Sequence, residues 1–168
     1  MALLMQLGEQ MPKFASKYGV DFVFFDGEEL VYKEGDPYFY GSERFATDYV
    51  NNPPAHKYKW GVLLDMIGDK ELQVYQEGYS VTWPDTRPLV DEIWGVAARL
   101  GVHEFIPVEG VKVLDDHTKL HDIGKIPTID IIDFDYPPWH TEDDTPRNCS
   151  ALSLAKVGWV VQVWLKGL

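Results

Sequence analysis

Short apolar runs alternate with helix-like segments along this chain, and this alternation constrains the fold more than any other feature. Strands are expected within four apolar stretches: VDFVFF (20–25), KWGVLLDMIGD (59–69), GVKVL (110–114) and PTIDIIDFDYP (127–137). Helices are expected between or after them: 41–52, 86–101 and 151–167. Such alternation is typical of a layered α/β domain with a largely parallel sheet. At 168 residues, the chain has the length of one such domain.

Residues that favour helix ends mark where these helices start and stop. Asp85 can cap the second helix, and Gly101 can close it. Ser150 can cap the last helix. The opening stretch, MALLMQLGEQMPKF, predicts a further helix that Pro12 ends. A short strand-like piece, ELQVYQEG, lies between the second apolar run and Asp85.

Acidic residues or a histidine follow each of the four predicted strands. The site of an open α/β sheet lies outside the carboxyl ends of its strands, so these side chains should share one crevice. The residues are Glu28, Glu29, Asp65, Asp115 and His140. Clustered carboxylates repel one another unless a cation neutralises them or one keeps its proton. A shared site is therefore our preferred explanation of the acidic turn at residues 26–29.

The side chains of this crevice suit a metal site made of carboxylate and imidazole. Cys149 is the only cysteine, which excludes a thiolate cluster and an intrachain disulfide. One carboxylate and one imidazole, with further acids nearby, suit a catalytic zinc that keeps an open position. In extended backbone Glu28 and Glu29 point to opposite sides. One can then bind metal while the other shuttles protons, and the pattern leaves open which does which.

Each of these residues also has a purely structural interpretation. Glu28 and Glu29 can be carboxylates of a surface turn, and Asp115 can cap a loop. A lone His140 is more often a surface or core histidine than a metal ligand. Asp65 is different, because an acid inside the apolar run LLDMIG needs a partner.

Charge and hydropathy exclude several kinds of partner. The formal net charge of −12 repels nucleic acid and anionic membrane surfaces. No apolar run approaches the roughly 20 residues that span a bilayer. The opening stretch lacks the basic start and the long apolar region of a secretory signal. With Met1 as the true start, we therefore expect a cytoplasmic protein.

Five motifs, in their order along the chain, resemble the glutaminyl cyclases and their relatives among the zinc-dependent aminopeptidases. They are VDFVFFDGEE, FYGSERFA, LLDMIGD, VLDDH and WHTEDDTPRNC, and the match extends over nearly the whole chain. The resemblance implies a three-layer α/β/α fold with a mostly parallel mixed sheet, as one catalytic domain over residues 1–168. It also implies zinc as the cofactor and a peptide N-terminus as the substrate.

The resemblance implies a role for each residue that matches a family motif. Glu28 matches the catalytic general acid/base, and Glu29 matches a zinc ligand. His140 matches the last zinc ligand, and Trp139 matches the tryptophan of the cyclase pocket. FYGSERFA and this Trp-His pair favour the cyclase branch, which converts an N-terminal glutamine into pyroglutamate with loss of ammonia. An aminopeptidase directs a zinc-bound water at the first peptide bond instead.

Two further acids match positions that differ between the branches. Asp115 matches the second acid of the cyclase hydrogen-bond network. Asp65 matches an acid that is hydrogen-bonded near the substrate in cyclases and binds a second zinc in aminopeptidases. Both acids are therefore expected beside the reacting groups.

The chain departs from the family pattern at its N-terminal end. The family carries a further zinc-ligating aspartate, and its first strands, ahead of the helix that here begins MALLMQL. With Glu29 and His140 as the remaining zinc ligands, we expect weak zinc binding or none. Uncovered strand edges and apolar surface predict a homo-oligomer. The alternative to an enzyme is a catalytically impaired remnant that acts as a structural or interaction module.

Overall fold

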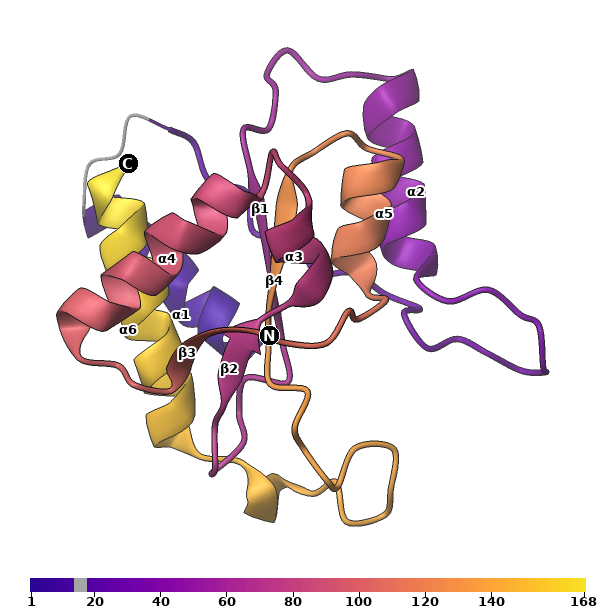
Figure 1. The fold of residues 1–168 in the computed structure, drawn as a ribbon. Helices are drawn as coiled ribbons and strands as arrows, with labels where there is room; N and C mark the ends of the chain where they lie inside the picture. The colour runs from indigo at the N-terminus through magenta and orange to yellow at the C-terminus, as the bar shows by residue number, and fades with distance from the viewer. Residues whose placement is uncertain (14–17) are drawn as a thin grey trace.

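Four short strands form two parallel pairs in the computed structural model, which describes residues 1–13 and 18–168 (Figure 1). β1 (Gly61–Asp65) pairs with β4 (Thr128–Ile132), and β2 (Val74–Gln76) pairs with β3 (Phe105–Glu109). Parallel partners need long crossover connections, and helices supply them here. The predicted α/β class with parallel strands is confirmed.

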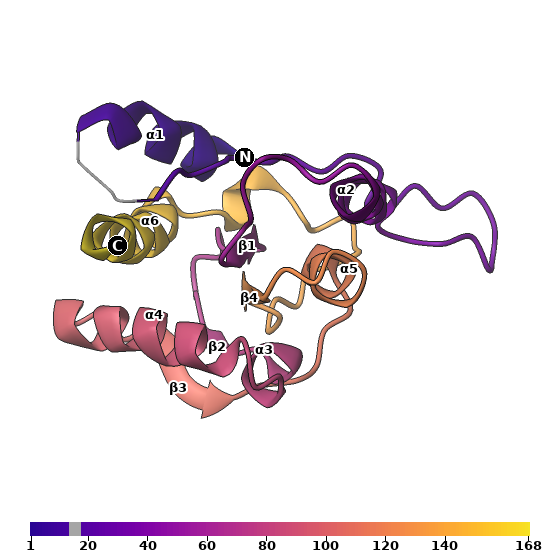
Figure 2. The ribbon, with the colours of Figure 1, turned by 90° about the horizontal axis from the view of Figure 1, so that it is seen from above.

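Helices pack on both sides of the β1–β4 pair (Figure 1, Figure 2). One side carries α1 (Ala2–Gln10), α4 (Arg87–Leu100) and α6 (Ala151–Gly167), and the other carries α2 (Tyr40–Asn51) and α5 (Asp116–Asp122). The remaining described elements are α3 (Gly78–Thr82) and two 3-10 turns, Met11–Lys13 and Pro146–Asn148. None of the helices in the described residues is long and apolar enough to cross a bilayer.

β4 forms the centre of the hydrophobic core, and all five of its residues are buried. Ile129 and Ile131 are fully buried, as are Leu89 and Ile93 at helical spacing on α4. Burying side chains of this size stabilises the fold by about 1.5–3 kcal/mol each. The core therefore fixes β4 firmly, and with it the strand β1 that pairs along it.

Two of the predicted strands are absent where the sequence placed them. Residues 20–25 form no strand, because no ladder partner lies beside them among the described residues. Residues 110–114 form no strand either, and β3 lies just before them instead. An apolar run shows that a segment is buried, whereas a strand also needs a hydrogen-bonded neighbour.

Most of the predicted helix ends are correct. Ser150 accepts a hydrogen bond from the main-chain N–H of Ser153 at 3.3 Å, and Gly101 closes α4 in the left-handed conformation with φ 71°. The prediction for Asp85 is wrong, since Thr86 occupies the N-cap position of α4. The Asp85 carboxylate instead lies 3.3 Å from Nε2 of His121. The opening helix ends at Gln10 and continues as a 3-10 turn that contains Pro12.

Candidate active site

The acidic turn at residues 26–29 lies against the first turn of α2. Gly27 adopts the left-handed conformation with φ 67°, which lets the chain reverse between Asp26 and Glu28. Gly41 is the contact point on α2, because a Cβ atom there would lie only 2.5 Å from the carbonyl oxygen of Asp26. The glycine of the FYGSERFA motif thus allows the main chain before Glu28 to approach the helix.

Backbone strain gathers around this turn. Phe39, Met66 and His140 are three of the four non-glycine residues with positive φ in the described chain, at 67°, 50° and 58°. Met66 follows Asp65 directly, and the N–H of Phe39 donates to the carbonyl oxygen of Glu28 at 2.8 Å. Such conformations are unfavourable for residues with side chains and concentrate at functional sites. The strain marks the same crevice as the acidic side chains.

Glu29 and His140 meet across the crevice, although they lie 111 positions apart in the sequence. Nε2 of His140 is 2.5 Å from Oε1 of Glu29, and both side chains are about half exposed. The ring of Trp139 stacks on that of His140, with centroids 4.0 Å apart and planes 26° apart. Trp139 is 44% exposed, so its ring stays accessible beside His140.

Glu28 carries the pKa expected of a proton-transfer group. Partial burial and the neighbouring carboxylates, first Glu29 and then Asp116 and Asp65, raise its pKa to about 7, against the opposing effect of His140. A group with a pKa near neutral can both accept and donate a proton at physiological pH. Perturbed carboxylates of this kind are typical of functional sites.

Asp65 and Asp115 form the buried side of the crevice. Burial, followed by the charge of Asp65, raises the pKa of Asp115 to about 8. Burial is also the main cause of the raised pKa of Asp65. Asp116 belongs to the same group, because it is 6% exposed and burial raises its pKa as well. The structure therefore brings Glu28, Asp65 and Asp115 together, and it adds Asp116.

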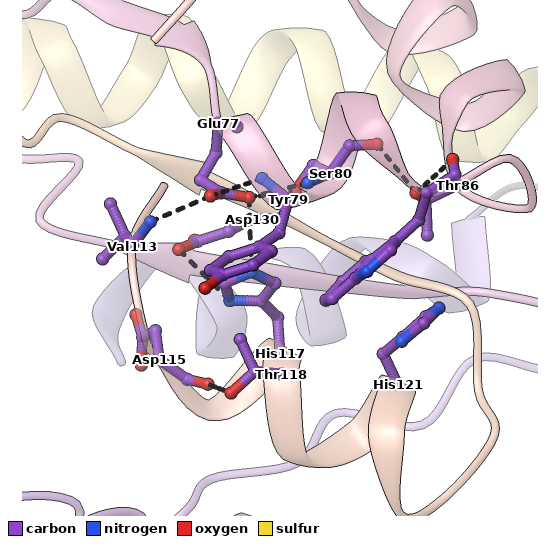
Figure 3. A network of polar contacts seen from close by, with 12 residues as sticks. Glu77, Tyr79, Ser80, Thr86, Val113, Asp115, His117, Thr118, His121 and Asp130 are labelled. Atoms are coloured by element: carbon purple, nitrogen blue, oxygen red, sulfur yellow. Dashed lines mark hydrogen bonds and ion pairs between the residues drawn. The ribbon is translucent and has the colours of Figure 1, made fainter. Parts of the chain in front are cut away.

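A buried network beside Asp115 fixes the start of α5 (Figure 3). The ring of His117 lies between two carboxylates, with Nε2 3.3 Å from Oε2 of Glu77 and Nδ1 3.6 Å from Oδ2 of Asp130. All three side chains are fully buried. One carboxylate oxygen of Glu77 also accepts the main-chain N–H of Val113 at 3.0 Å. Glu77 therefore contacts the chain on both sides of Asp115, at Val113 before it and at His117 after it.

Glu77 is ionised in spite of its burial. Desolvation alone would raise its pKa, but hydrogen bonds from His117 and from the N–H groups of Tyr79, Val113 and Ser80 outweigh this effect and lower it to about 2. The N–H groups of Tyr79 and Ser80 each lie 2.8 Å from its carboxylate, at the start of α3. Burial drives the pKa of Asp130 the other way, well above its usual value, and nearby carboxylates add to the rise.

Sequence reasoning missed this network. Asp130 offered a signal, because it interrupts the apolar strand of β4 in the same way that Asp65 interrupts the apolar run of β1. His117 belongs to the VLDDH motif but was given no role of its own. Nothing in the local pattern pointed to Glu77 as a link to the α5 segment, because its partner Val113 lies 36 residues further along the chain.

The described residues do not complete a catalytic zinc site. Glu29 and His140 supply one carboxylate and one imidazole in contact, whereas a catalytic zinc takes three protein ligands. Within residues 1–13 and 18–168, no group of three or more His, Cys, Asp or Glu side chains is arranged to hold a metal ion. Two protein donors are fewer than the three that a catalytic zinc requires.

Comparison with known proteins gives a consistent result. The profile described as "Peptidase family M28" matches residues 1–165. The crystal structure of a glutaminyl cyclase from Fimbriiglobus ruber superposes with a TM-score of 0.89 at 39% identity, over 98% of this chain. A glutaminyl cyclase from Tannerella forsythia gives a TM-score of 0.85 at 31% identity, over 99% of this chain. A Zn-dependent exopeptidase from Parabacteroides distasonis gives 0.85 at 30% identity, over 97% of it.

These relatives are longer than the part that matches. The chain spans 58% of the Fimbriiglobus protein, 60% of the Tannerella protein and 60% of the Parabacteroides protein. An uncharacterised protein of Saccharomyces cerevisiae is 26% identical in an alignment 162 residues long, which covers 81% of this chain and 44% of the yeast protein.

Proposed function

The chain belongs to peptidase family M28, and from this premise we propose that its acidic crevice transfers protons in a reaction at the N-terminus of a peptide. One observation carries the proposal: Glu28, with a pKa of about 7, lies among Glu29, Asp65 and Asp116 at the crevice. A carboxylate tuned to neutral pH is the group that general acid/base catalysis requires.

A cyclisation of N-terminal glutamine fits this arrangement best. The α-amino nitrogen attacks the carbon of the side-chain amide, and a new C–N bond forms. Glu28 accepts the proton that the attacking amine loses. The bond to the amide nitrogen then breaks, and Glu28 returns the proton so that ammonia leaves. Two of the solved relatives that match at 39% and 31% identity are glutaminyl cyclases by name, which favours this branch.

The other side chains of the crevice hold the reactants. Asp115 keeps its proton at neutral pH, because its pKa is about 8, and can therefore donate a hydrogen bond to the substrate. Asp65 accepts hydrogen bonds beside it. Trp139 offers an exposed ring face to the glutamine side chain. Glu29 and His140 are the two donors that this chain would present to zinc, which would polarise the amide when bound.

Removal of an N-terminal residue is the competing reaction on the same scaffold. The similarity to a Zn-dependent exopeptidase supports it. In this reaction Glu28 takes a proton from the attacking water and gives it to the amine that leaves. Asp65 would then be a ligand for a second zinc instead of a hydrogen-bond partner of the substrate.

A non-enzymatic role is the second candidate, and the short donor set favours it. Glu29 and His140 alone make a weak zinc site, so the chain can be a catalytically impaired remnant that serves as a structural or interaction module. Such a protein would keep the fold and the acidic crevice without turnover.

Zinc analysis of the purified protein, combined with turnover assays, separates these functions. Glutaminyl and aminoacyl peptide surrogates are tested side by side. Turnover of the glutaminyl substrate supports the cyclase, turnover of the aminoacyl substrate supports the exopeptidase, and zinc without turnover supports the remnant. If neither zinc nor turnover is found, the enzymatic proposal fails.

Variants of the two adjacent glutamates test the division of roles. Glu28→Gln should abolish turnover and leave the zinc content intact, because it removes proton transfer but no ligand. Glu29→Gln should lose zinc as well. Glu92→Gln, on the exposed face of α4, is the matched control and should behave as the parent chain. Equal zinc loss at positions 28 and 29 would contradict these assignments.

Trp139→Ala tests the substrate pocket. The variant should weaken binding of a small glutaminyl substrate, seen as a raised KM, while the free energy of unfolding changes little, since the ring is 44% exposed. A variant that loses stability but keeps its KM would show that Trp139 contributes to folding and not to substrate binding.

A further inference from the structure

The ring of His117 is fully buried, and each of its nitrogens faces a different carboxylate (Figure 3). Nε2 lies 3.3 Å from Oε2 of Glu77, and Nδ1 lies 3.6 Å from Oδ2 of Asp130. Among the described residues, no other group hydrogen-bonds to either ring nitrogen or to the carboxyl oxygens of Asp130. Buried polar groups are normally hydrogen-bonded, so these two acids are the partners that the ring has to use.

The two acids require opposite hydrogen bonds from the ring. Glu77 has a pKa of about 2 and is ionised at neutral pH, so its carboxylate can only accept. Asp130 is fully buried and receives no other hydrogen bond. Burial, and then the nearby carboxylates beginning with Asp115, hold the pKa of Asp130 well above its usual value. Asp130 therefore keeps its proton and has an O–H to donate.

A neutral imidazole supplies both of these bonds at once, because it has one N–H donor and one acceptor nitrogen. With the proton on Nε2, the ring of His117 donates to Glu77 and accepts the Asp130 O–H at Nδ1. The opposite tautomer would direct a lone pair at the ionised Glu77. A doubly protonated ring would leave the Asp130 O–H without an acceptor, or would require a second buried carboxylate charge. One tautomer therefore satisfies all three side chains.

This chain of three side chains reaches the segment that carries Asp115. His117 lies on the first turn of α5, and Asp115 is the N-cap residue of the same helix. The carbonyl oxygen of Asp115 accepts the hydroxyl of Thr118 at 2.7 Å. Glu77 holds the main chain just before Asp115, through the N–H of Val113 at 3.0 Å. The main chain on both sides of Asp115 is thus tied to the two partners of one hydrogen-bonded pair.

We propose that His117 is a positioning residue for the acidic crevice: as a neutral ring with its proton on Nε2, it joins Asp130 on β4 to Glu77 at the start of α3 and so sets the place of the Asp115 carboxyl. His117 itself touches no substrate. Its effect on turnover rests on the proposed function, in which Asp115 donates a hydrogen bond to the substrate. Misplacing such a group lowers the rate of the chemical step more than it weakens substrate binding.

The nitrogen chemical shifts of the ring test the tautomer in the unmodified chain. Two-bond ¹H–¹⁵N spectra of protein with labelled histidine distinguish the two neutral tautomers from each other and from the doubly protonated ring. The chain has five histidines, so single His→Gln variants of the other four assign the His117 signal by elimination. At neutral pH we expect an acceptor Nδ1 and a protonated Nε2. A proton on Nδ1, in either of the other two forms, would overturn the proposal.

Two substitutions at Asp130 test whether the ring positions Asp115. Asp130→Asn is the conservative variant, because its amide N–H replaces the O–H toward Nδ1, and it should keep kcat within about twofold. Asp130→Leu has a similar size but no donor, and it should lower kcat by about tenfold or more while KM stays within about threefold. Ile131→Val, also buried on β4, is the control for lost stability alone: the urea midpoint should fall and kcat should not change.

The ¹³C chemical shift of the Asp115 carboxyl gives a second measurement that needs no turnover. The signal should match the parent chain in Asp130→Asn and Ile131→Val, and it should move in Asp130→Leu. A folded Asp130→Leu variant with the parent signal and the parent kcat would show that His117 is only structural. An Asp130→Asn variant as impaired as Asp130→Leu would also overturn the proposal.

These measurements keep the role of His117 separate from the proposed function. If neither peptide surrogate is turned over, the proposed function fails, while the tautomer and the Asp115 signal still decide whether His117 positions the crevice. If Asp130→Leu does not fold, the tautomer and the Asp130→Asn variant decide in its place, because a proton on Nδ1 or a displaced Asp115 signal in Asp130→Asn would each contradict the proposal.

Discussion

The two halves of the acidic crevice are held in place by different means. Asp115 stands on the start of α5, where Glu77 and His117 tie the flanks of its segment into the core. Glu28 and Glu29 stand on a loop, and the Glu29–His140 contact that joins this loop to the next is half exposed. The half with Asp115 is fixed by buried charged groups and main-chain hydrogen bonds. The half with Glu28 and Glu29 is fixed by the half-exposed Glu29–His140 pair and by the close approach of Gly41 to the main chain of Asp26.

This difference shows how much of the site folding alone can organise. The buried half is held by groups of the chain itself, because the Glu77 carboxylate accepts the main-chain N–H groups of Tyr79, Ser80 and Val113. The loop half retains left-handed backbone at Phe39 and His140, a conformation that costs about 1–3 kcal/mol where it is strained. A metal ion or a substrate would act mainly on this half, so variants on the two sides should differ widely in stability.

Glu77→Ala is the strongest test of the buried half. The change leaves His117 and the N–H groups of Val113, Tyr79 and Ser80 without an acceptor, so the free energy of unfolding should fall by about 3–5 kcal/mol. Urea denaturation measures it. Glu104→Ala is the control, since it breaks a partly exposed ion pair with Lys156 and should cost about 1 kcal/mol or less. Similar losses in both variants would remove the distinction.

Gly41→Ala tests the glycine contact of the loop half. The new methyl group meets the main chain of Asp26 at 2.5 Å, which cannot move aside as a flexible side chain can. We expect a loss of about 1–3 kcal/mol. Gly95→Ala on α4 is the matched control, because its nearest neighbour is Nη1 of Arg99 at 3.6 Å. It should be neutral or stabilise by about 0.5–1 kcal/mol.

The pH dependence of the free energy of unfolding should distinguish the contribution of Glu77, in the buried network, from that of Asp115, in the crevice. The lowered pKa of Glu77, about 2, contributes stability above the unfolded value near 4.5, and this contribution is lost as the pH falls toward 2. The raised pKa of Asp115, about 8, contributes stability that is complete below pH 4 and is lost as the pH rises through 8.

Asp115→Asn should therefore flatten the alkaline limb of the profile. Relative to the parent chain, the variant should gain about 1 kcal/mol or more between pH 5 and 8, since one pKa unit corresponds to about 1.4 kcal/mol. The acidic limb should stay unchanged. Urea midpoints at several pH values measure both limbs, and an unaltered alkaline limb would show that Asp115 does not retain its proton.

Glu29→Gln should give the smallest effect on stability. The pair with His140 is about half exposed on both sides, and pairs of this kind contribute about 0–1 kcal/mol. The same experiment with His140→Gln should give an equally small change. A loss near that of Glu77→Ala would mean that the loop half is as rigid as the buried half.

The sequence predicted candidate residues that stand out from their immediate neighbours, such as an acid inside an apolar run. It could not predict features that depend on a partner far away in the sequence. Asp65 was recognised because an acid stands in an apolar run. The strand-end argument placed Glu29 and His140 in one crevice, but their pairing as zinc ligands came only from the family resemblance, since spacing does not show which residues 111 positions apart will touch. Residues 20–25 were misassigned for the same reason, because a strand requires a neighbour that the run itself does not specify.

The position of Asp130 has a consequence for the folding rate. It lies in the middle of β4, and β4 pairs with β1 in a register that joins Gly61 to Thr128. Such long-range parallel pairing is intrinsically slow, because a large loop must close before any contact forms. Here the strand must also desolvate a carboxylate, which is possible only with its proton or beside His117. We expect the refolding rate to rise as the pH falls toward 4, where a growing share of unfolded chains carries Asp130 already neutral.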